Sequence, residues 1–224
     1  GGRLSCDQAR GIAALSRRFG NGLIDLSARA NVQLRGVAET NHGPLIEGLR
    51  ALGLIDRSTE AEARRNITIT PVWAEGDGTA DLAHRLTAAL AADDAPQTPG
   101  KFGYVLDCGP RPVLQATSAD IRIERGAAGL ILRADGAERG ALVTADTAAP
   151  MALRLARWFL DSGGAPEGRG RMAAHLARGA KLPQEFAGVP SPTDPAPTPG
   201  PGPLPQGWLV GFDFGQMRAE TLSI

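Results

Sequence analysis

Four polar side chains alternate along residues 26–36, and their chemistry suits the binding of carboxylates. They are Arg29, Asn31, Gln33 and Arg35. Because successive side chains of a strand point to opposite faces, an extended chain here would place all four on one face and the apolar residues between them on the other. Two guanidinium and two carboxamide groups in a row suit a flat ligand with several carboxylates. The same pattern also fits the solvated outer face of an antiparallel sheet.

The elements around this row predict a small α+β unit. Apolar residues recur at helical spacing over residues 7–19, and residues 23–26 and 31–37 have the composition of two strands. Asn41 is expected to cap a second helix that ends at Gly53. This helix–strand–strand–helix order is that of a ferredoxin-like fold that lacks its first strand.

Residues 58–182 predict a larger unit with a mixed sheet. Alternating apolar residues indicate several strands, and Asp135-Gly136 between two of them is a hairpin signal. Three segments with helical periodicity accompany the strands. The expected strands cover residues 65–71, 102–106, 121–124, 129–134 and 140–144, and the expected helices cover residues 79–92, 150–160 and 172–177.

Residues 183–206 are expected to form an extended linker. From Pro190 onward, proline recurs at every second or third position with Ser, Thr and Gly between, which is typical of a semi-rigid polyproline conformation. The apolar segment 207–224 that follows is too short to bury a core alone. It therefore either docks back on the first unit or opens a further domain.

The composition argues against two classes of partner. The 24 basic and 24 acidic residues give a net charge of zero over 224 residues, whereas general nucleic-acid binders carry a basic excess. No run of about 18 apolar residues is present, so the sequence predicts no membrane span. We expect a cytoplasmic protein that binds neither nucleic acid nor a membrane.

The cysteines and histidines predict no metal site in this chain. Cys6 and Cys108 are the only cysteines, too few for a disulfide framework or for a four-iron cluster, which needs four thiolates. Cys108 is expected to be a buried structural residue, because no histidine is paired with it in the sequence. The three histidines, His42, His84 and His175, are too widely spaced to define a ligand set.

Four motifs in this order resemble the nitrite/sulfite reductase superfamily, over about residues 1–180. They are residues 2–10 (Gly-Arg-Leu-Ser-Cys-Asp-Gln-Ala-Arg), residues 28–36 (Ala-Arg-Ala-Asn-Val-Gln-Leu-Arg-Gly), Arg65-Asn66, and Pro99-Gly100-Lys101-Phe102-Gly103. The resemblance implies an α+β protein: a ferredoxin-like half-domain over residues 1–57, then a larger mixed α/β sheet domain of the nitrite/sulfite reductase type over residues 58–182.

The resemblance also implies a second half. Residues 215–222 (Gly-Gln-Met-Arg-Ala-Glu-Thr-Leu) are similar to residues 2–7, so residues 207–224 are expected to start a second ferredoxin-like half-domain after the linker. The chain is then expected to be the N-terminal half of a longer enzyme. Its partners would be the C-terminal half of the same polypeptide and an electron donor.

The resemblance assigns a site that surrounds a tetrapyrrole. In the sirohaem reductases of the superfamily, the corresponding positions contact the macrocycle and its anionic substrate. Carried over, these positions are Arg29, Arg65 and Lys101, and Gln33 and Arg35 share the strand face of Arg29. The expected catalytic residue is Lys101, and the expected tetrapyrrole-binding residues are Arg29, Asn31, Gln33, Arg35, Arg65, Asn66 and Lys101. Those reductases have a second lysine where this chain has Gly103. Its absence should weaken the capture of sulfite or nitrite, and a glycine would leave space above the ring.

The Lys-Phe-Gly form is similar to the precorrin-3B synthase branch of the superfamily, in which the tetrapyrrole is the substrate. This resemblance implies an oxygen-dependent monooxygenase of cobalamin biosynthesis with a 4Fe-4S cluster and a non-haem iron. The cluster ligands would lie in the second half, so this chain alone is expected to be inactive. Two alternatives stay open: a sirohaem-dependent nitrite or sulfite reductase, and a non-catalytic tetrapyrrole-binding module.

Overall fold

The computed structural model describes residues 3–27, 31–55, 58, 62, 64–192, 195–204 and 207–222. The chain forms two compact units. The small unit comprises residues 2–62 and 200–224, and the large unit comprises residues 63–199. Both combine helices with sheets, so the expected α+β class is confirmed.

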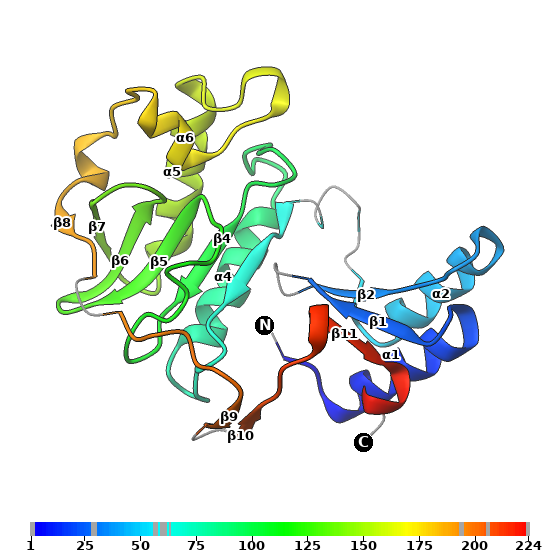
Figure 1. Cartoon of the computed structure of the whole chain (residues 1–224). Helices are drawn as coiled ribbons and strands as arrows, with labels where there is room; N and C mark the ends of the chain where they lie inside the picture. The colour runs from blue at the N-terminus through cyan, green and yellow to red at the C-terminus, as the bar shows by residue number, and fades with distance from the viewer. Residues whose placement is uncertain are drawn as a thin grey trace. The chain divides into compact units, whose positions relative to one another are not determined.

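The small unit begins with the expected helix–strand–strand–helix order (Figure 1). Its elements are α1 (Cys6–Phe19), β1 (Leu23–Leu26), β2 (Val32–Leu34) and α2 (Glu39–Ala51). Ser5 caps α1 through a capping box with Gln8, in which each side chain accepts from the other's backbone N–H. Gly36, with φ at 67°, supplies the positive φ that turns the chain away after β2.

The expected cap of α2 was wrong. The helix begins at Glu39 with Ala38 as its N-cap residue, so Asn41 lies inside the first turn. The Asn41 side chain instead donates its amide N–H to the carbonyl oxygen of Phe19, at 3.2 Å. The Asn41 side chain therefore ties the start of α2 to the end of α1.

The C-terminal segment completes the sheet of the small unit. The hairpin β9 (Gly202–Leu204) and β10 (Gly207–Leu209) is followed by a turn of 3-10 helix, η3 (Asp213–Gly215), then β11 (Gln216–Arg218) and η4 (Ala219–Leu222). Strand β11 pairs antiparallel with β1, giving the strand order β11-β1-β2. Residues 216–222 therefore dock on the first half-domain; the interpretation that they also open a second copy stays a prediction.

A small apolar core lies on one face of this sheet. Ile12 and Ala13 of α1 pack with Ile24 of β1, Met217 of β11 and Ala219. Val32 and Leu34 also contact this core, whereas Gln33 between them is exposed. The alternation expected along β2 is therefore confirmed for these three residues.

The large unit is built on a six-stranded mixed sheet of order β3-β4-β5-β6-β7-β8. Strands β3, β4 and β5 are parallel, and each later strand is antiparallel to its neighbour. The strands are β3 (Ile67–Ile69), β4 (Tyr104–Asp107), β5 (Ile121–Gly126), β6 (Gly129–Ala134), β7 (Arg139–Val143) and β8 (Val189–Pro190). The helices are α4 (Thr79–Ala91), α5 (Ala148–Asp161), α6 (Met172–Ala177) and the short 3-10 helices η1 (Pro166–Gly168) and η2 (Gln184–Phe186).

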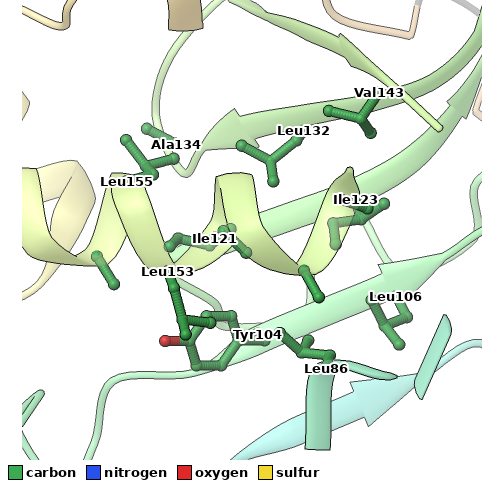
Figure 2. Close-up of a cluster of buried hydrophobic side chains, with 14 of the residues drawn as sticks. Leu86, Tyr104, Leu106, Ile121, Ile123, Leu132, Ala134, Val143, Leu153 and Leu155 are labelled. Carbon is green, nitrogen blue, oxygen red and sulfur yellow. The ribbon is translucent and has the colours of Figure 1, made fainter. Parts of the chain in front are cut away.

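The main core lies between this sheet and helices α4 and α5. Figure 2 shows Leu153 and Leu155 of α5 against side chains of β4, β5 and β6, among them Tyr104 and Ile121. Phe102, just before β4, packs against Phe159 of α5, with the ring centroids 5.0 Å apart. This packing anchors the segment that carries Lys101.

The first part of the expected linker is packed on the large unit. Phe186 of η2 is 1% exposed and belongs to the main core, and β8 pairs with β7. Further along, Ala196 donates its backbone N–H to Pro112, and the Thr198 hydroxyl donates to the carbonyl oxygen of Val113. The proline-rich composition therefore did not reveal how closely residues 183–192 and 195–198 pack on the large unit.

Candidate functional site

The predicted site residues of the small unit lie on the exposed side of its sheet. Asn31, Gln33 and Arg35 are exposed, and Arg29 lies outside the described residues. The Arg35 guanidinium donates from Nε to Oδ2 of Asp25, at 2.5 Å, and from Nη2 to Oε1 of Gln33, at 2.9 Å. The structure thus brings Gln33 and Arg35 together as the strand pattern predicted.

Asp25 organises this face from the central strand, and the sequence reasoning missed it. Its Oδ1 accepts from Nε2 of Gln216, at 2.9 Å, while its Oδ2 accepts from Arg35. The hydrogen bond from Gln216, followed by the bond and charge of Arg35, lowers the pKa of Asp25. The carboxylate therefore stays ionised and fixes the guanidinium, while offsetting its positive charge. Its signal in the sequence is one acidic residue within an otherwise apolar strand.

Arg65, Asn66 and Lys101 lie on the two neighbouring segments that precede β3 and β4, at one edge of the large sheet. Strands β3 and β4 are parallel and in register at Ile67 and Tyr104, so the residues just before each strand lie side by side. The Asn66 amide donates to the carbonyl oxygen of Phe102, at 3.2 Å, and the backbone carbonyl of Asn66 accepts from Tyr104 N–H, at 2.8 Å. Arg65 and Lys101, which flank these bonds, are both exposed.

Gly103 does not provide the open space that its lack of a side chain suggested. A Cβ at Gly103 would lie 2.9 Å from Nδ2 of Asn66, closer than real Cβ contacts allow. The Gly103 N–H also donates to Oδ2 of the buried Asp120, at 2.9 Å. The glycine is therefore explained by tight packing between Asn66 and the start of β5.

The predicted residues thus form two groups, one in each unit. Gln33 and Arg35 share the small sheet with Asp25, whereas Arg65, Asn66 and Lys101 share the edge of β3 and β4. Each group presents hydrogen-bond donors on exposed side chains. Each has the chemistry to bind carboxylates or another anion.

A buried ionic network occupies the large sheet on the face opposite α4 and α5, and sequence reasoning missed it as well. Glu124 accepts from Arg133, with Nε 2.6 Å from Oε2, and Arg122 lies 2.6 Å from Asp135. Arg122 also donates to the carbonyl oxygens of Leu114, Gln115 and Thr117. The network therefore holds the loop that covers this face.

The cysteines and histidines show no arrangement for metal binding in the part of the chain that the structure describes. No three His, Cys, Asp or Glu side chains gather there. Cys108 is buried, as expected, and burial raises the pKa of its thiol to about 12. His175 lies against Trp158 and Phe159 and is 2.8 Å from the Ser162 hydroxyl, which gives it a structural role.

The described helices include none that is both long and apolar enough to span a bilayer.

Comparisons with known proteins agree with this architecture. Residues 1–52 match the model of the nitrite/sulfite reductase ferredoxin-like half domain. A precorrin-3B synthase from Sinorhizobium sp. is 33% identical over 118 residues, which cover 50% of this chain and 25% of that protein. The NirA protein of Mycobacterium tuberculosis has a similar fold, with a TM-score of 0.67 over 98% of this chain and 47% of that chain, at 17% identity.

The matched segments cover less than half the length of both relatives. The low identity to NirA shows a common fold alone, whereas the half-domain model and the synthase match the sequence itself. The three findings agree with one another and support a similarity of this chain to the nitrite/sulfite reductase superfamily, whose half-domain model matches residues 1–52.

Proposed function

We propose that this chain supplies the cationic binding surface for a polycarboxylated tetrapyrrole in an oxidoreductase of the precorrin-3B synthase type. The observation that carries the proposal is the edge of β3 and β4, where the Asn66–Phe102 hydrogen bond joins the two segments that carry the exposed Arg65 and Lys101. The sequence match to a precorrin-3B synthase supports a tetrapyrrole as the substrate class.

The two cations have different tasks in this proposal. A guanidinium binds a carboxylate through two parallel hydrogen bonds, each charged bond contributing roughly 1.5–3 kcal/mol, so Arg65 would grip an acid side chain of the macrocycle. Lys101 carries a compact charge on a flexible stem and would hold an anion or a reactive oxygen atom. It is therefore the proposed catalytic residue. On the small unit, the Arg35 guanidinium that Asp25 fixes would be a separate carboxylate-binding group.

The redox chemistry would come from other parts of the polypeptide. The resemblance implies a 4Fe-4S cluster and a non-haem iron, but the described residues hold no metal-binding group. The residues present therefore do not fit a metal centre, and we derive no step through one. The proposal for this chain is limited to binding and orienting the tetrapyrrole, with the C-terminal half and an electron donor as partners in the cytoplasm.

A sirohaem-dependent nitrite or sulfite reductase is the second candidate. It is favoured by the similarity of almost the whole chain to the fold of NirA. The absorption spectrum of the complete, anaerobically purified gene product separates the two. Intense sirohaem bands would identify the macrocycle as a resident cofactor and overturn the synthase proposal. A broad iron–sulfur shoulder without them would leave the ring site for a substrate.

Substitutions in the complete protein test the binding surface directly. Arg65→Ala and Lys101→Ala should each weaken binding of uroporphyrin, a porphyrin with eight carboxylates, measured by quenching of its fluorescence. Lys181→Ala is the matched control, because Lys181 is the only other lysine and is also exposed in the large unit. Equal affinity of all three variants and the native protein would reject the surface, and with it the non-catalytic binding module.

A further inference from the structure

A buried carboxylate joins the Lys101 segment to an arginine outside the predicted site. Asp120 lies immediately before β5 and is fully buried. It accepts from the backbone N–H of Gly103, at 2.9 Å, and of Met172, at 2.7 Å. Both of its oxygens also lie 3.0 Å from Nε of Arg171. This single carboxylate therefore connects the segments that precede β4, β5 and α6.

The guanidinium of Arg171 is held on one side and exposed on the other. Its Nη2 donates to Oγ of Ser118, at 2.9 Å, and to the carbonyl oxygen of Ala119, at 2.8 Å. The preceding backbone is confined, because a Cβ at Gly170 would lie only 1.9 Å from the carbonyl oxygen of Gly164. Even so, 37% of the Arg171 side chain is exposed. These bonds use Nε and Nη2, and Nη1 donates no hydrogen bond to the described residues.

We propose that Arg171 is a third donor of the carboxylate-binding edge formed by Arg65 and Lys101, and that Asp120 is the positioning residue for both Arg171 and the Lys101 segment. This inference rests on the proposed function and adds a residue to its site. Neighbouring strands lie about 4.8 Å apart. Arg65 and Lys101 precede the adjacent strands β3 and β4, and Arg171 is bonded to Asp120, which precedes the next strand, β5. The three donors are therefore spaced to meet successive carboxylates of one macrocycle.

The ion pair between Asp120 and Arg171 defines what the Arg171 side chain contributes to binding. Asp120 offsets the positive charge of Arg171, so the attraction of a polyanion to this edge comes mainly from Arg65 and Lys101. Arg171 contributes directed hydrogen bonds from a guanidinium that is already oriented, and it loses little side-chain entropy on binding. Arg171 should therefore affect the selectivity among tetrapyrroles with different numbers of carboxylates more than it affects the overall attraction of a polyanion.

The test compares two porphyrins on the complete protein, uroporphyrin with eight carboxylates and protoporphyrin with two. Arg171→Ala should weaken uroporphyrin binding about tenfold, as expected for one charged hydrogen-bonded contact, and leave protoporphyrin binding almost unchanged. Arg171→Lys should not restore the affinity, because an ammonium cannot reproduce the guanidinium geometry. Arg178→Ala, at the other end of α6, is the control. Unchanged circular dichroism and urea midpoints establish that the variants are folded.

Asp120→Asn tests the positioning role. Asp120→Asn should lower the affinity for uroporphyrin to that of Arg171→Ala. Lys101→Ala should then reduce this affinity by a smaller factor in the Asp120→Asn variant than in the native protein. If Arg171→Ala binds uroporphyrin as tightly as the native protein does while Arg65→Ala binds it more weakly, the role of Arg171 is overturned and the proposed function stands. If each of the three single variants, Arg171→Ala, Arg65→Ala and Lys101→Ala, binds uroporphyrin as tightly as the native protein does, the proposed function is rejected.

Discussion

Glu124 and Arg133 form an ion pair inside the large unit, with Oε2 of the carboxylate 2.6 Å from Nε of the guanidinium. Glu124 is fully buried, and Arg122 lies beside it, with Nη1 3.7 Å from Oε1. Gln115 Nε2 donates to the same Oε1, at 2.7 Å. One buried carboxylate therefore lies against two buried arginines, of which Arg122 has a second counter-charge in Asp135, 2.6 Å away. Sequence alternation along β5 and β6 produces this polar face, since Ile121, Ile123 and Leu132 point to the other side.

Removing the charge of Glu124 should destabilise the large unit strongly. Glu124→Gln leaves the buried Arg133 without its counter-charge, while Arg122 keeps Asp135, and breaking a buried ion pair costs about 3–5 kcal/mol. We expect a loss of this order in the free energy of unfolding, measured by urea denaturation. Asp7→Asn on α1 is the matched control, because the Asp7–Arg10 pair is exposed and should cost less than about 0.5 kcal/mol. A Glu124→Gln protein as stable as this control would show that the pair is not needed.

Gly103 and Asn66 should be energetically coupled. A methyl group at residue 103 would displace the Asn66 amide and break its bond to the Phe102 carbonyl, which is worth about 1 kcal/mol. Gly103→Ala and Asn66→Ala should each destabilise the protein, and the double variant should cost clearly less than the sum. Gly100→Ala is the control, because a Cβ there meets nothing within 4 Å. If the losses in the free energy of unfolding, measured by urea denaturation, were strictly additive, the coupling would be contradicted.

The two cysteines should differ in reactivity in the folded protein. Burial raises the pKa of the Cys108 thiol to about 12, so it stays protonated and enclosed at pH 8, whereas Cys6 is exposed on α1. Brief alkylation with iodoacetamide followed by peptide mapping should label Cys6 and leave Cys108 unmodified. In urea both should be labelled. Labelling of native Cys108 at the rate of Cys6 would show that the thiol is accessible.

Local patterns predicted much of the fold. Residues 172–177 and 129–134 have the predicted helix and strand, because their apolar residues recur at the period of a single element. The pairing of β11 with β1 had no local signal, since the Asp25–Gln216 contact joins residues 191 positions apart. The pattern of residues 31–37 revealed a polar face but not its internal pairing, because Asp25 comes from the neighbouring strand.

The site at the large unit was predicted in part for a similar reason. Arg65, Asn66 and Lys101 came from the resemblance, and the parallel pairing of β3 with β4 explains why the segments that carry them are neighbours. Asp120 was missed because its role depends on three backbone and side-chain donors that are distant in the sequence. In the sequence, an acidic residue before a strand looks the same whether it is a buried acceptor of several hydrogen bonds or an exposed loop residue.

His175 should give the stability of the large unit a dependence on pH. Burial, followed by the positive charge of Arg178, lowers its pKa below the ordinary value of 6.5. The unfolded chain therefore binds this proton at a higher pH than the folded one does. The stabilisation by neutral His175 is fully present above about pH 6.5 and is lost as the pH falls through the lowered folded-state pKa.

The charged groups near His175 define the control for this measurement. Arg178 is the charge that acts on its pKa, while the Ser162 hydroxyl and the rings of Trp158 and Phe159 pack around it. We expect the free energy of unfolding from urea titrations to fall less steeply between pH 7 and pH 5 in His175→Gln than in the native protein. His84→Gln, on the exposed side of α4, should keep the native slope. If the two variants had the same slope, the buried histidine would not be the source of the dependence.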